Sequence, residues 1–212
     1  IVTDPIEPAA ARVLRDEIRK ITPLPVKYVV YSHEHWDHVS GGQLFKDEGA
    51  VFISHENCVA HFKDLPNPDI VLPDQTYSGE HYDLTLGNRT LQLRYYGHNH
   101  GDCLSVMTPA HVNVPFIVDL GTAGGMPLPF IPDYSLHHWV RTLRELEAEP
   151  FDSYVGGHGI PVAPKSRLTE RRQYLEALMS ETKRELDART GLEDIPDIVA
   201  TPLTARLTHP RH

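Results

Sequence analysis

The chain has 212 residues, with 29 acidic and 20 basic side chains and a formal net charge of -9. This length predicts one compact unit, and the acidic balance argues against a surface that binds nucleic acid. A hydrophobic content of 40% is typical of a globular protein. Because nothing approaches the ~18 consecutive apolar residues of a membrane helix, we expect a soluble protein without a membrane partner.

The first part of the chain alternates helix and strand signals. Residues 8–21 begin with proline and place apolar side chains at helical spacing, which predicts an amphipathic helix. Residues 25–32, rich in Val and Tyr, predict a short buried strand that leads into a histidine-rich loop. An expected strand at 50–54 lies between short helix signals at 41–49 and 55–64.

The middle of the chain changes character. Residues 71–108 contain short β segments separated by turn signals that include glycine. A further strand is expected within residues 111–121, with its apolar run ending at Asp119. A loop rich in Pro and Gly covers 121–134, and residues 135–146 carry an apolar stripe that predicts a helix packed on the core.

The last part predicts one more strand and turn at 151–159 and a long, mostly charged helix at 167–188. We interpret residues 1–190 as a single domain and residues 191–212, which hold three prolines, as a C-terminal tail. The chain begins at Ile1 without a charged and then apolar leader, so a cytoplasmic location and export after leader removal both stay open.

The chain has only two cysteines, Cys58 and Cys103. They do not form a close pair of the kind that marks a thiolate zinc site or a redox motif, and two residues establish no disulfide framework. We therefore interpret both as small buried hydrophobic side chains.

Histidine is the compositional outlier, with fourteen copies in a chain of this length. The stretch "HEHWDH" at 33–38 holds four candidate ligands, His33, His35, Asp37 and His38, and their spacing supports two ions instead of one. Three later segments, "GHNHGD", "IVD" and "GGHG", also end strands with His or Asp near glycine. An Asp directly after an apolar run is costly unless a cation or hydrogen-bond donors satisfy it. These segments predict a metal centre built from four strand ends.

The stretch His-x-His-x-Asp-His resembles the signature of the metallo-β-lactamase superfamily. That resemblance implies an α+β fold, a four-layer αββα sandwich of the metallo-β-lactamase type, apparently lacking the usual first N-terminal strands. It implies one metal held by three histidines, another held by Asp37 and two histidines, and a bridging acid. The implied ligands, in chain order, are His33, His35, Asp37, His38, His98, Asp119 and His158.

The family resemblance also implies chemistry. We expect a dinuclear-zinc hydrolase, with iron or manganese possible, in which a metal-bridging hydroxide attacks an ester, lactone, thioester or lactam bond of a small molecule. Asp37 is the expected catalytic residue, which orients the hydroxide. His100 and Asp102 are interpreted as groups that orient their neighbours, and Asp4 as a carboxylate partner of a metal-binding histidine.

Other functions stay open at this point. A phosphodiesterase or nuclease of the same superfamily would use the same ions but would need a basic groove. A mononuclear-iron persulfide oxygenase would hold one iron per chain. An inactive metal-binding fragment is the non-enzymatic alternative. Independently of the function, we expect an N-terminal segment or a second chain to complete the first sheet.

Overall fold

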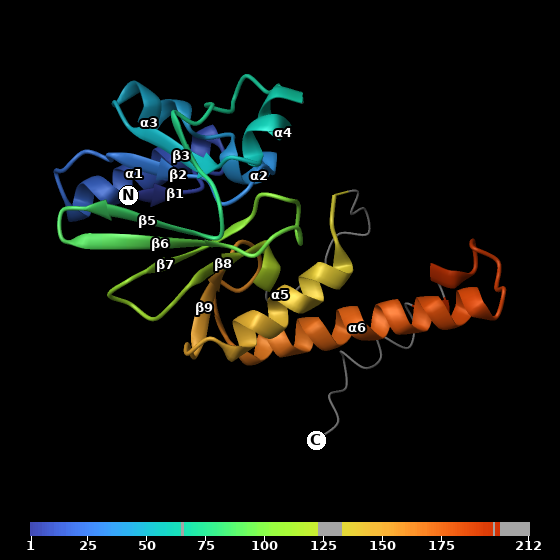
Figure 1. Ribbon diagram of the computed structural model, residues 1–212. Helices are drawn as coiled ribbons and strands as arrows, with labels where there is room; N and C mark the ends of the chain where they lie inside the picture. Colours follow the sequence, from blue (N-terminus) through green and yellow to red (C-terminus); the bar gives the residue numbers. More distant parts are fainter. Residues whose placement is uncertain (65, 123–132, 197, 200–212) are drawn as a thin grey trace.

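The computed structural model describes residues 1–64, 66–122, 133–196, 198 and 199 (Figure 1). The predicted loop at 121–134 and the predicted tail at 191–212 therefore lie largely outside the described residues. Ile195 and Val199, at the end of the described chain, are buried against the long helix α6 (Ser166–Asp187). The division of the chain at residue 190 stays a prediction.

Two β-sheets form the centre of the fold (Figure 1). The first is parallel, in the order β1-β2-β3-β4, and the second runs β10-β9-β8-β7-β6-β5 and is antiparallel except between β8 and β9. The strands of the first sheet are β1 (Val2–Thr3), β2 (Tyr28–Val30), β3 (Val51–His55) and β4 (Gln75–Tyr77). Those of the second are β5 (His81–Leu86), β6 (Arg89–Tyr95), β7 (Ser105–Pro109), β8 (Phe116–Val118), β9 (Ser153–Gly156) and β10 (Val162–Pro164).

Helices cover the outer face of each sheet. The helices are α1 (Pro8–Ile21), α2 (Trp36–Val39), α3 (Gln43–Asp47), α4 (Cys58–Asp64), α5 (Leu136–Ala148) and α6, with a short 3-10 helix η1 (Asp119–Gly121). Figure 1 shows α1, α3 and α4 on the side of the first sheet and α5 and α6 on the side of the second. The predicted four-layer αββα sandwich is confirmed.

Alternating side chains along the strands separate the three cores of this sandwich. On β2, Val29 packs among the helices and Val30 packs between the sheets, and on β3 the same division separates Phe52 from Ile53. Successive strand residues point to opposite faces, so continuous apolar runs are needed wherever both faces are buried. A third core, which includes Trp139 of α5, lies between the second sheet and its helices.

Several elements differ from their predicted extent. Residues 36–39, expected in a loop, form the short helix α2. The strand expected within 111–121 is reduced to β8, and Asp119 already belongs to η1. Among the described helices, none combines the length and apolar character needed to cross a bilayer.

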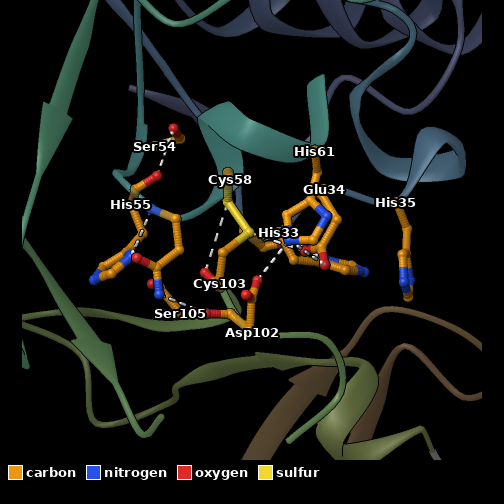
Figure 2. Close-up of a disulfide and its surroundings, with 12 residues drawn as sticks. His33, Glu34, His35, Ser54, His55, Cys58, His61, Asp102, Cys103 and Ser105 are labelled. Carbon is orange, nitrogen blue, oxygen red and sulfur yellow. Dashed lines mark hydrogen bonds and ion pairs between the residues drawn. A yellow bond between two sulfur atoms is a disulfide. The ribbon is translucent and has the colours of Figure 1, made fainter. Parts of the chain in front are cut away.

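The interpretation of Cys58 and Cys103 as separate hydrophobic side chains is wrong. Their sulfur atoms form a disulfide that ties the start of α4 to the segment before β7 (Figure 2). The two residues are 45 positions apart in the sequence, so only the folded arrangement of α4 beside that segment brings them together.

We expect the double substitution Cys58→Ala/Cys103→Ala to lower the free energy of unfolding by about 4 kcal/mol. A crosslink that closes a loop of this length removes that much chain entropy from the unfolded state at 25 °C. Denaturant unfolding of both proteins without reductant measures the difference. Reduction of the wild-type chain is the control and should produce a loss of similar size, whereas a change below about 1 kcal/mol would contradict the expectation.

Candidate metal centre

Seven His and Asp side chains from four separate segments converge at one edge of the two sheets. The segments follow β2, β6, β8 and β9, and β6, β8 and β9 run in the same direction, so their carboxyl ends meet. Within the described residues, their ligand atoms form two groups, each with all atoms within 4.8 Å of one another. One group is His33, His35, His100 and Asp119, and the other is Asp37, His38 and His158.

Asp119 lies where the two groups meet. Its Oδ2 atom is 3.3 Å from Nε2 of His100 in the first group and 3.3 Å from Nε2 of His38 in the second. The same oxygen is 3.5 Å from Nε2 of His158. Val118, the residue before it, has φ 55, a backbone conformation that is strained for a β-branched side chain. This strained turn at the end of β8 directs the carboxylate into the cluster.

The nitrogen atoms of the cluster face one another in a way that suits a cation. Nε2 of His38 and Nε2 of His158 are 3.3 Å apart, and Nε2 of His100 lies 3.1 Å from Nδ1 of His35. Nε2 of His33 is buried and has no hydrogen-bond partner. Buried polar atoms normally have partners, and imidazole nitrogens together with a carboxylate are ligands that divalent transition metals accept. The donor set therefore fits a metal centre.

Further contacts orient these side chains from outside. Asp4 Oδ2 lies 3.2 Å from Nδ1 of His38, so the predicted contact between Asp4 and a motif histidine is present. Ser32, whose hydroxyl donates to the same Asp4 carboxylate, lies 2.7 Å from Nδ1 of His33. Such carboxylate and hydroxyl partners fix the ring orientation of metal-binding histidines.

Two orienting residues carry no motif signal. Asp133 Oδ2 lies 2.8 Å from Nε2 of His35, and the Tyr134 hydroxyl lies 3.3 Å from Nε2 of His100. Both lie at the end of the Pro- and Gly-rich stretch in the sequence, where no spacing marks a single residue as functional. Their role appears only when the fold places them beside the histidines.

The electrostatics of the cluster centre on Asp119. Burial alone would raise the pKa of this carboxyl, but hydrogen bonds from the surrounding histidines lower it far below its usual value. Burial lowers the pKa of His38, yet its bonds to Asp119 and Asp4 outweigh burial and raise the pKa to about 10. Burial lowers the pKa of His33 well below its usual value. The carboxylate thus remains ionised and attracts positive charge.

The structure places one predicted ligand, His98, outside the two groups of ligand atoms. His98 is exposed and its Nε2 bonds to the backbone oxygen of Asp133, whereas His100 is buried and joins His33 and His35. The intervening Asn99 is buried, and its side chain accepts from the backbone N–H of His100. His98 therefore faces outward while His100 faces the cluster. The six other residues predicted as ligands all lie in the two groups.

Comparison with known proteins identifies the family of this chain. A family model described as the metallo-beta-lactamase superfamily matches residues 3–158. The chain belongs to the metallo-β-lactamase superfamily. Among solved structures, the metallo-β-lactamase from Pontibacter korlensis superposes with a TM-score of 0.71 at 20% identity, covering 83% of this chain and 80% of that one. The DIM-1 metallo-β-lactamase superposes with a TM-score of 0.70 at 17% identity, covering 82% of this chain and 78% of that one.

One curated protein is similar in sequence. The 2,4-dinitroanisole O-demethylase subunit alpha of Nocardioides sp. (strain JS1661) is 27% identical over 153 residues. The match covers 71% of this chain and 46% of that relative, so it reaches less than half of the relative's length. The superfamily fold and the His and Asp cluster together indicate a metal-dependent enzyme.

Proposed function

We propose that this chain is a dinuclear metal-dependent hydrolase that acts on a small molecule. The observation that carries the proposal is the separation of the seven side chains into two groups of ligand atoms that meet at Asp119. A single cation accepts three or four protein ligands, so seven converging side chains exceed what one ion needs.

The proposed ligand sets follow the two groups. His33, His35 and His100 would hold one cation, Asp37, His38 and His158 would hold the other, and Asp119 would contact both. The predominance of imidazole favours zinc, with iron or manganese as alternatives. Two such ions, when bound, lower the pKa of a shared water towards ~7 and so supply a nucleophile at neutral pH.

The chain's own residues would position the reacting groups. Asp37 is the most exposed carboxylate of the cluster, with 37% of its side chain accessible, and its Oδ2 lies 3.1 Å from Nε2 of His158. We assign it the role of orienting the attacking water and accepting its proton. Asp119 is only 7% exposed, so its role is to hold charge inside the cluster.

The proposed substrate is a small ester, lactone, thioester or lactam. The net charge of -9 disfavours a phosphodiester backbone as substrate, since such ligands require a basic surface. The sequence similarity to a 2,4-dinitroanisole O-demethylase subunit supports a second candidate, hydrolytic removal of a methyl group from an activated aryl ether.

A substrate panel tests the proposal. We expect turnover of at least one member of a set containing chromogenic esters, lactones, thioesters, a cephalosporin and 2,4-dinitroanisole, and we expect a chelator to abolish it. Restored turnover after zinc addition would link the loss to the metal. If no member is hydrolysed by zinc-loaded protein, the proposed hydrolase function fails for these bond classes.

Asp37→Asn tests the role of Asp37 directly, because it keeps the size of the side chain and removes its charge. We expect most turnover to be lost while some metal stays bound. Unchanged turnover would refute the role of Asp37. Metal analysis that finds one iron per chain would instead favour the persulfide oxygenase.

A further inference from the structure

A second cluster of potential ligands lies beside the disulfide and outside the seven-residue cluster. Glu34, His61 and Asp102 come from the loop after β2, from α4 and from the segment before β7. Their ligand atoms all lie within 4.8 Å of one another. Figure 2 shows Glu34 and His61 beside the bond between Cys58 and Cys103.

The Glu34 side chain gives the strongest sign that this cluster takes a ligand. It is only 7% exposed, and its Oε1 atom is buried without a hydrogen-bond partner. This oxygen lies 3.7 Å from Nε2 of His61 and points into the cluster. A buried carboxylate oxygen with no hydrogen-bond partner costs free energy comparable to a lost charged hydrogen bond, unless something else satisfies it.

Gly101 leaves room for the Glu34 carboxylate because it has no side chain. A Cβ atom on Gly101 would lie 2.5 Å from Glu34 Oε1, so any other residue at position 101 would displace the carboxylate. Gly101 also has φ 72, which favours glycine. The turn at Gly101 therefore accommodates the Glu34 carboxylate and also carries Asp102, the next residue in the chain.

The disulfide holds the other two members in place. His61 follows Cys58 by three residues on α4, so the two side chains lie on the same face of that helix. Asp102 precedes Cys103 directly, and its Oδ1 lies 2.6 Å from Nε2 of His61. One covalent bond thus fixes the helix and the segment that supply the two exposed ligands.

We propose that Glu34, His61 and Asp102 bind an additional divalent transition cation such as zinc. One imidazole and two carboxylates suit zinc, and the partial exposure of His61 and Asp102 leaves coordination positions for water. The cation would satisfy Glu34 Oε1 and balance two carboxylates that share one imidazole. Glu34 also lies within reach of His35 and Asp133, but those two side chains already bond to each other.

Metal stoichiometry tests this site without measuring activity. Metal-free wild-type chain, kept without reductant, is titrated with zinc by calorimetry, and bound zinc is counted after gel filtration. We expect His61→Ala and Glu34→Gln each to bind one zinc fewer per chain than wild type. His111→Ala is the matched control, because His111 is exposed and belongs to none of the groups of potential ligands found in the described residues, and it should keep the wild-type count.

Two further variants keep the outcome decisive. Asp102→Asn removes the charge of an exposed carboxylate without changing its size, and it should also bind one zinc fewer per chain. It therefore tests the site even if the buried substitution Glu34→Gln prevents folding. His33→Ala reports on the seven-residue cluster alone, which separates failure of that centre from failure of this site. Wild-type stoichiometry in both His61→Ala and Asp102→Asn would overturn the proposal.

Discussion

His100→Ala should sharply weaken cation binding, whereas His98→Ala should leave it close to wild type. His100 is buried, and its Nε2 lies 3.3 Å from Asp119 and 3.1 Å from His35. His98 is exposed, its Nε2 bonds to the backbone oxygen of Asp133, and its ring lies near that of His138, outside both groups of ligand atoms. Loss of a group that merely orients a ligand costs about 10–100-fold in metal affinity, so loss of a ligand should cost at least that much.

Zinc titration of the two variants measures this difference, and turnover of any substrate found in the panel should follow it. The pair is well matched, because both variants remove an imidazole from the same turn two residues apart. Thermal unfolding of the metal-free proteins serves as the control for folding, since His100 is buried and His98 is not. Loss of affinity in His98→Ala, with wild-type affinity in His100→Ala, would reverse the assignment of this ligand.

The local part of the centre could be predicted from the sequence because its spacing is short. His33, His35, Asp37 and His38 lie within six residues, so their side chains stay close together in most backbone conformations. The alternation of strand and helix signals likewise placed this stretch after a buried strand, where the structure has it after β2.

The choice between His98 and His100 could not be predicted, because it depends on tertiary contacts of the turn. Gly97 and Gly101, on either side of the two histidines, both adopt positive φ, which favours glycine. The side-chain amide of Asn99 donates to the hydroxyl of Thr142 on α5, and this contact holds the turn against the core. No spacing rule in the sequence reports on that contact.

The same limit applies to distant pairs. The disulfide and the Glu34, His61 and Asp102 cluster both depend on α4 lying beside the segment before β7, although these elements are far apart in the sequence. Similarly, β4 and β10 have three residues each, too few for an alternating pattern to stand out from a loop. Their pairing with neighbouring strands, not their composition, determines their conformation.

Gly157→Ala should disable the centre although residue 157 supplies no ligand. A Cβ atom there would lie 2.2 Å from Oδ1 of Asp119 and 3.1 Å from Cε1 of His38, so the carboxylate or the backbone must move. Overpacking of this kind costs about 1–3 kcal/mol of stability. Because a misplacement near 1 Å can lower turnover by about 100-fold, we expect a loss of that size, with weaker zinc binding.

Gly156→Ala is the matched control, one residue earlier in the same strand end. A Cβ atom on Gly156 would have its nearest contact at 3.4 Å, an ordinary van der Waals distance to the backbone oxygen of Gly121. We therefore expect its stability within about 0.5 kcal/mol of wild type and unchanged zinc binding. Equal zinc affinity in the two variants would show that Asp119 tolerates displacement, and its proposed position between two cations would then be wrong.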